Sequence, residues 1–272
     1  MSNRIGRIAI AVYSVLVIVF LAIPMIIITG VSLGSTSYAT FPPVDPSLQW
    51  YADIAADPYW MDSLLLSLGV AAAAAVIAVA LAFALSMVLV RSKIRFKRAL
   101  YTLVLLPLII PKLVTAVALY DTYYAVDQMM MIVAGHAIVA ISTAVIIMSA
   151  TIRSVDQNLE RAAWTMGASR FRVLTKITLP LAAPGLIAAF ILSFLASFDE
   201  FFIGLFFSSP DVVTLPIRIF TALTHQVSPA VAAVSTVMIL IVAIALLLIV
   251  IFNKSASRKG ASTKVQLPGN AG

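Results

Sequence analysis

Long apolar runs with few charged residues are the feature that most restricts how this chain can fold. Crossing the roughly 30 Å hydrocarbon core of a bilayer takes about 20 helical residues. Six runs reach that length, at residues 8–31, 64–90, 100–120, 129–151, 181–207 and 231–252, and charges interrupt the fifth. The chain as a whole is 62% hydrophobic and 11% charged. Because the runs are continuous rather than short and alternating, they predict an all-α polytopic membrane protein with six transmembrane helices.

The positions of the basic residues predict how the spans are oriented. If six spans alternate in direction, all of the 18 Lys and Arg residues except Lys112 and Arg218 fall on one side. Lys and Arg near span ends are retained on the cytoplasmic side. Both termini are therefore expected in the cytoplasm, and the net charge of +7 is explained by topology and anionic inner-leaflet lipid rather than by nucleic-acid binding.

The chain is expected to form a single transmembrane domain over residues 1–252, followed by a disordered cytoplasmic tail, 253–272. Pro107 and Pro111 interrupt the third span, and Lys112 follows directly. Such broken helices need protein or cavity water to satisfy the backbone groups that they free. The basic turn 91–98 is interpreted as a topology determinant in contact with lipid headgroups.

The cytoplasmic loop 152–180 carries the pattern of two short helices. Four apolar residues form one face of the first helix at i, i+3, i+4 and i+7, namely Leu159, Ala162, Ala163 and Met166. Gly167 is expected to end this helix in the left-handed conformation, and Ser169 to cap the second. Pro180 is expected to close it and begin span five. The pattern predicts a helix-turn-helix that lies in the lipid interface or docks in a groove of a partner protein.

The same loop resembles the signature of the permease subunits of bacterial ATP-binding-cassette (ABC) importers. That signature is E-A-A, three residues, G, nine residues, I, one residue and L-P. The matching residues are Ala162, Ala163, Gly167, Ile177, Leu179 and Pro180. The family's Glu before the alanines is Arg161 here, with Glu160 one position earlier. The segment 197–236, which begins "SFDEFF", further resembles the spermidine and putrescine branch of the family.

The resemblance implies a permease subunit in the bacterial inner membrane, with several partners. They are ABC ATPase subunits, a second permease subunit that is identical or a sister chain, and a periplasmic substrate-binding protein. The resemblance assigns the coupling to the ATPase to the loop residues Glu160, Arg161, Ala162, Ala163, Gly167, Ala168, Ile177, Leu179 and Pro180. The chain lacks the phosphate-binding run G-x-x-x-x-G-K-[ST], so it is expected to be no enzyme, with ATP hydrolysed elsewhere.

No cofactor and no metal site are expected from the sequence. It contains no cysteine, and its two histidines, His136 and His225, are far apart without metal-ligand spacing. Structural or interfacial roles are expected for both histidines.

Two neighbouring carboxylates, Asp199 and Glu200, lie inside the fifth apolar run. At about 1.5 Å per residue they reach a depth similar to that of Lys112, roughly 20 Å from the inner boundary. Two hypotheses remain open: one carboxylate pairs with Lys112 to neutralise both charges, or at least one is a transient site for a cationic substrate such as a polyamine. Adjacent helical residues point about 100° apart, so one carboxylate can pair while the other faces the pathway.

The rival class is an ion-coupled secondary transporter that works without an ATPase. It would use Asp199, Glu200 and Lys112 as an ion relay. Transporters of that class usually contain an internal repeat, and the sequence shows no convincing one.

Overall fold

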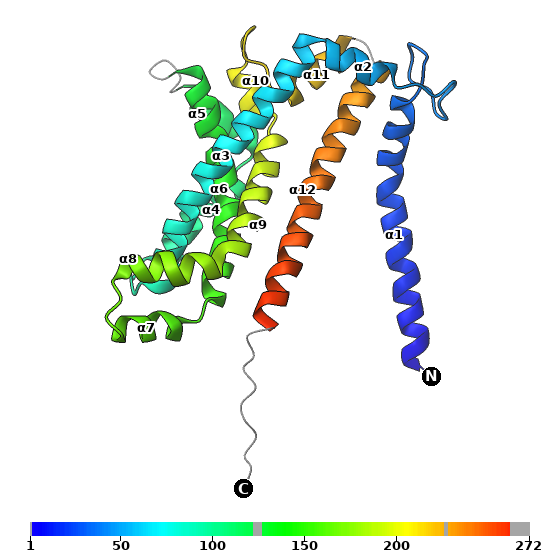
Figure 1. Ribbon diagram of the computed structural model, residues 1–272. Helices are drawn as coiled ribbons and strands as arrows, with labels where there is room; N and C mark the ends of the chain where they lie inside the picture. Colours follow the sequence, from blue (N-terminus) through cyan, green and yellow to red (C-terminus); the bar gives the residue numbers. More distant parts are fainter. Residues whose placement is uncertain (1, 122–126, 226–227, 262–272) are drawn as a thin grey trace. The chain divides into compact units, whose positions relative to one another are not determined.

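The computed structural model describes residues 2–121, 127–225 and 228–261, and it is helical almost throughout that part (Figure 1). An isolated β-bridge joins Ser209 and Val212. The predicted all-α class is therefore confirmed for the described residues.

Five helical segments of the described chain are long and apolar enough to cross a membrane, and a bent pair of helices adds a sixth if it is one span. The single segments are α1 (Ser2–Ser32), α3 (Pro58–Arg91), α6 (Gln128–Ser154), the run Arg170–Phe198 and α12 (Pro229–Ala261). A polytopic membrane protein with five or six membrane helices is thus confirmed. Helix α12 continues to Ala261 and therefore extends into the tail that was predicted over residues 253–272. Residues 262–272 lie outside the described part.

The bent pair is the predicted third span. It consists of α4 (Lys97–Ile109) and α5 (Lys112–Tyr120), whose axes meet at 96°. Pro107 lies within α4 without ending it, whereas the break falls at Ile110 and Pro111. Ile110 is extended, with φ −70° and ψ 134°, as expected of a residue that precedes a proline.

The fifth span differs from the prediction at both ends. Its helix starts at Arg170, because α8 (Arg170–Val173), the π-helical turn η2 (Leu174–Thr178) and α9 (Leu179–Phe198) are continuous. Pro180 therefore does not separate loop from span, since a proline is tolerated in the first turn of α9. At the other end α9 stops at Phe198, and a separate short helix follows, α10 (Phe202–Phe207).

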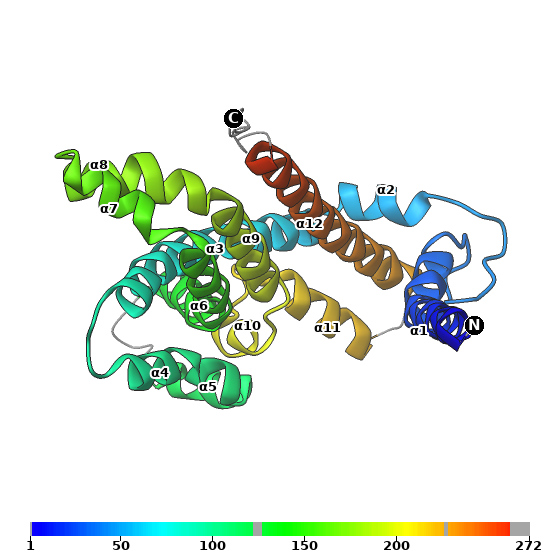
Figure 2. The same ribbon diagram turned by 90° about the horizontal axis from the view of Figure 1, so that it is seen from below.

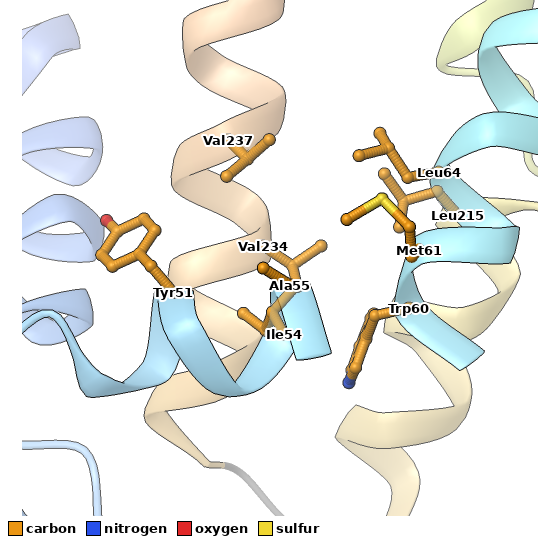
Figure 3. A pocket seen from close by; sticks show the side chains of 9 residues that line it. All are labelled: Tyr51, Ile54, Ala55, Trp60, Met61, Leu64, Leu215, Val234 and Val237. Atoms are coloured by element: carbon orange, nitrogen blue, oxygen red, sulfur yellow. The ribbon is translucent and has the colours of Figure 1, made fainter. Parts of the chain in front are cut away.

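The chain divides into two compact units. The first comprises Met1–Leu64 with Leu215–Ala243. In this unit the loop after α1 is tied back to the helix end, because Trp50 in α2 (Gln49–Ala56) donates from Nε1 to the Gly34 carbonyl at 2.8 Å. A mostly apolar pocket of about 210 Å³ lies among α2, α3, α12 and α11 (Leu215–His225), lined by Trp60, Met61 and Val234 among others (Figure 3).

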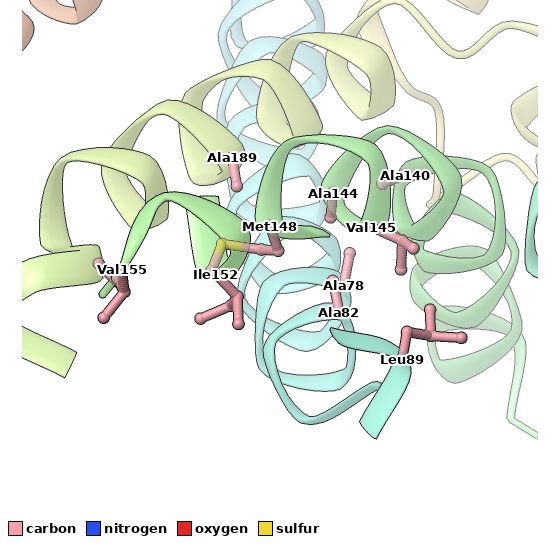
Figure 4. Close-up of a cluster of buried hydrophobic side chains, with 11 residues drawn as sticks. Ala78, Ala82, Leu89, Ala140, Ala144, Val145, Met148, Ile152, Val155 and Ala189 are labelled. Carbon is pink, nitrogen blue, oxygen red and sulfur yellow. The ribbon is translucent and has the colours of Figure 1, made fainter. Parts of the chain in front are cut away.

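The second unit, Leu65–Thr214 with Ile244–Gly272, packs through small residues. Ala78 and Ala82 of α3 meet Ala140 and Ala144 of α6 in its buried cluster (Figure 4). Small residues let helices approach closely where no hydrophobic effect drives their association. Helices α6 and α9 lie side by side in both ribbon views (Figures 1 and 2), and a Cβ added at Gly185 would lie 2.0 Å from Thr151 Oγ1.

The second unit has two distinct ends. Helices α7 (Gln157–Thr165) and α8 lie at one end, and α5 and α10 lie at the opposite end (Figure 1). These two ends contain the residues that the sequence singles out.

Candidate functional site

The predicted coupling loop folds as a helix, a tight turn and a second helix. Asp156 begins α7 by accepting a hydrogen bond from the Asn158 amide at 2.9 Å. Gly167 ends it at φ +84°, and its amide donates to the Trp164 carbonyl. Ser169 then caps α8 by accepting from the Arg172 amide at 3.3 Å. These contacts confirm the predicted glycine turn and the predicted serine cap.

Glu160 points inward from α7 and is 4% exposed. Its Oε1 accepts hydrogen bonds from Arg91 Nη2 at 3.2 Å and from Thr178 Oγ1 at 2.9 Å. The same Arg91 nitrogen donates to the Val155 carbonyl at 2.8 Å. One carboxylate thus joins α7 to the end of α3 and to η2.

The outward side of α7 combines a basic residue with apolar ones. Arg161 is exposed and donates to Gln157 Oε1 at 3.5 Å within the same helix. Leu159 is 48% exposed and Met166 80%, and Ala162 is also exposed. Ala163, in contrast, is buried at 5%. The predicted apolar face is therefore divided: Ala163 lies with Glu160 on the inner side, as a spacing of three residues on a helix requires.

The other predicted loop residues lie after α7. Gly167 and Pro180 are exposed, whereas Ala168, Ile177 and Leu179 are half-buried. A cavity of about 450 Å³ lies between α7 and the run that begins at α8, and it is lined by Arg91, Glu160, Arg161 and Arg170 among others.

The second charged cluster lies at the two helix breaks on the opposite end. Glu200 is fully buried and forms an ion pair with Lys112, with Oε2 and Nζ 2.8 Å apart. Its Oε1 accepts from the Phe202 amide at 3.0 Å and the Ile203 amide at 3.3 Å. The carboxylate therefore caps α10 and connects it to the first residue of α5. The predicted pairing with Lys112 is confirmed, and Glu200 makes it.

Asp199 is placed differently from its neighbour. It follows the last residue of α9 and is exposed. Within the described part of the chain its carboxylate has no ion pair and no hydrogen bond. The two adjacent acids are thus separated, one buried and paired and the other exposed.

Aromatic side chains follow α9 toward Asp199. The rings of Phe190 and Phe194 stack with centroids 6.5 Å apart, and those of Phe194 and Phe198 with centroids 5.7 Å apart. Beyond the break, Phe201 makes an edge contact with Phe202 at 5.5 Å. The Phe198 ring at the end of this stack is buried, at 2% exposed, whereas Asp199, the next residue, is exposed.

The histidine prediction can be examined at one of its two positions. His136 of α6 is 2% exposed, and its Nδ1 lies 2.8 Å from Ser197 Oγ of α9. This contact joins α6 to α9, and the structural role of His136 stays a prediction. The His225 side chain lies outside the described part.

Sequence reasoning missed the two side chains that hold Glu160. The sequence assigned Arg91 to lipid contact, and Thr178 carried no motif. Nothing in the sequence marked the contacts of Glu160, because its partners lie 69 and 18 residues away. The one sequence signal for these contacts was that the motif's Glu stands one position earlier in this chain, at Glu160.

The chain is similar in sequence to known transport proteins. A family model described as "Binding-protein-dependent transport system inner membrane component" matches residues 79–258, well over half of the chain. The putrescine transport system permease protein PotI of Escherichia coli (strain K12) is 29% identical over 81% of this chain and 82% of its own length. The spermidine/putrescine transport system permease protein PotC of Haemophilus influenzae is 26% identical over 82% and 87%.

Relatives with other printed substrates also match. The molybdenum transport system permease protein ModB of Mycobacterium bovis is 31% identical over 71% of this chain and 78% of its own. A solved bacterial ABC transporter involved in the import of the acidic polysaccharide alginate is similar in fold, with a TM-score of 0.69 and 18% identity over 92% of this chain and 96% of that one. The proteins that resemble this chain in sequence or fold therefore differ in the substrates that their names print.

Proposed function

We propose a mechanism that starts from one premise. This chain belongs to the family of inner membrane components of binding-protein-dependent transport systems, and it is a permease subunit of an ABC importer. The premise removes the rival class of an ion-coupled transporter that works alone. Still to be assigned are the topology, the contact with the ATPase, and the substrate.

The proposed topology is a single transmembrane domain over residues 1–252 with six spans and both termini in the cytoplasm. Its support is the environment of the two basic residues that fall on the outer side. Lys112 is paired with Glu200. Arg218 donates from Nε to Ser63 Oγ at 3.2 Å and lies over the Tyr59 ring at 5.3 Å. Because both cations are bound within the chain, neither opposes this orientation.

The proposed coupling contact is the outward side of α7, docked on a separate ATPase subunit. Leu159, Ala162 and Met166 supply apolar contacts, and Arg161 supplies a charge. A helix that exposes an apolar face beside a charged residue is suited to a groove on a partner. Since Arg161 replaces the Glu of the family motif, the facing residue on the ATPase is expected to be acidic rather than basic.

The proposed working unit contains further partners. Two permease subunits, this chain with a sister chain or a second copy, would enclose the pathway. A periplasmic binding protein would deliver the substrate, in keeping with the family's description as binding-protein-dependent.

The proposed substrate is a polyamine or a related amine-bearing small molecule. PotI and PotC are permeases of putrescine and spermidine/putrescine systems by name. The observation that carries the proposal to this chain is Asp199, an exposed carboxylate without a partner among the described residues, at the end of α9. An acid at this depth is costly unless it faces water or a cationic partner.

Uptake of labelled putrescine and spermidine tests the proposal. Cells that lack their own polyamine systems would express this chain with the ATPase, sister permease and binding protein encoded beside it. We expect ATP-dependent uptake that Asp199→Asn abolishes. The matched control is Asp211→Asn, the same change at another exposed aspartate. If the complex assembles and hydrolyses ATP but takes up neither amine, the importer stands and the substrate is wrong.

A further inference from the structure

Glu160 occupies the position where the coupling helix meets the membrane helices. It lies one residue before the motif position, and one residue rotates a side chain by about 100° around a helix. The rotation directs Glu160 inward with Ala163, while Arg161 is exposed at the rim of the cavity beside α7. The carboxylate is therefore unavailable to a partner that docks on the outer side of α7.

The contacts of Glu160 connect three segments through one oxygen. Arg91 is the last residue of α3, and Thr178 is the last residue of η2. Because η2 continues directly into α9, the contact with Thr178 reaches a membrane helix. Hydrogen bonds to an ionised acceptor in a buried place are among the stronger ones in proteins.

The backbone alone gives α7 little support. It is joined to α6 by Val155 and Asp156 and to α8 by the turn at Gly167. The cavity of about 450 Å³ lies between α7 and the rest of the loop. Without the inward contacts of Glu160, α7 would be free to tilt about its two connections.

We propose that Glu160 is a positioning residue that clamps α7 to α3 and to the base of α9, so that a displacement of α7 moves both membrane helices together. The clamp rests on the proposed coupling of this loop to an ATPase. It assigns to Glu160 a role inside the chain, with Arg91 and Thr178 as its two anchors. The π-helical turn fits this role, since such turns occur frequently at functional positions in helices.

The test measures how much substrate is moved for each ATP hydrolysed. The complete importer would be reconstituted in liposomes, with putrescine uptake and ATP hydrolysis recorded together. Glu160→Gln removes the charge and keeps the shape, and Thr178→Val removes the second anchor. We expect each to lower the ratio of uptake to hydrolysis roughly fivefold. A mere loss of assembled complex would not change this ratio.

Two matched controls lie within the same loop. Asp156→Asn makes the same acid-to-amide change at the exposed cap of α7, where asparagine caps equally well. Thr175→Val repeats the valine change inside η2, at a hydroxyl that donates within its own helix, to the Phe171 carbonyl. Both are expected to leave the ratio unchanged.

A second readout keeps the test independent of transport. Hydrogen exchange of the α7 amides in the purified complex should accelerate in Glu160→Gln and not in Asp156→Asn. Uptake and hydrolysis that fall in proportion, or an unchanged ratio with unchanged exchange, would overturn the clamp. A wild-type complex that does not couple hydrolysis to uptake would instead overturn the proposed function, while the exchange result still decides whether the clamp exists.

Discussion

The two ends of the second unit share one arrangement, in which a buried and paired glutamate lies beside an exposed charged residue. The exposed charges at the two ends have opposite signs. At the α7 end, buried Glu160 is paired with Arg91 while the next residue, Arg161, is exposed. At the α10 end, buried Glu200 is paired with Lys112 while the preceding residue, Asp199, is exposed. In both places the glutamate joins segments of the chain, and its neighbour presents a charge to the outside. A cation is presented on the side proposed for the ATPase, and an anion on the side proposed for the substrate.

The two glutamates differ in how they are satisfied. One oxygen of Glu160 accepts from two side chains, whereas Glu200 accepts from two backbone amides and pairs with Lys112 through its other oxygen. Glu200 is also fully buried, where a charge without a counter-ion is costly. Changes at the α10 end should therefore cost more stability than changes at the α7 end.

The largest effect is expected from Lys112→Met. It leaves Glu200 as a buried charge without a counter-ion, which costs about 3 kcal/mol. Thermal unfolding of the purified chain in detergent measures it, with Lys93→Met at an exposed position as control. An unchanged midpoint would show that the ion pair does not hold the two breaks together.

A smaller effect is expected from Gly185→Ala, in the close contact of α6 with α9. The added Cβ would lie 2.7 Å from Thr151 Cβ and 2.0 Å from its Oγ1, and relieving that overlap costs about 2 kcal/mol. Gly69→Ala is the control, because its Cβ meets nothing within 4 Å. Equal unfolding midpoints for the two variants would contradict the packing described for the second unit.

Arg161→Glu should weaken the ATPase contact without changing the stability of the chain. Reversing an exposed charge at a partner surface costs about 1 kcal/mol, or roughly fivefold in affinity, and less at high salt. Titration of purified ATPase onto the permease measures it, with Arg95→Glu in the basic turn as control. Tighter binding by Arg161→Glu would mean that the family's Glu contact is preserved in the partner and that Arg161 opposes it.

The smallest effect is expected from Asp156→Asn. Both residues are good helix caps, so the unfolding free energy should change by less than about 0.5 kcal/mol. The thermal measurement used for Lys112→Met detects it. A larger loss would indicate that the Asp156 charge has a partner beyond the Asn158 amide.

Sequence patterns predicted the elements better than the contacts between them. Apolar length located the spans, and the glycine and serine of the loop located its turn, because these are local properties. The break after Phe198 was missed, because the run "FDEFFIGLFF" is apolar enough to favour a continuous helix. A new helix begins instead at Phe202, whose amide donates to the buried Glu200 carboxylate. The partners of Glu160 and the inward turn of Ala163 depend on tertiary packing, which periodicity alone does not contain.

Thiol labelling at position 199 tests the central claim most directly. The chain contains no cysteine, so Asp199→Cys introduces a single reactive group. In the assembled complex we predict that a positively charged, membrane-impermeant thiol reagent modifies this variant from the outer side, while Ser197→Cys, at a position 1% exposed, stays unmodified. An Asp199→Cys variant that does not react from the outer side would contradict the assignment of Asp199 to the substrate pathway.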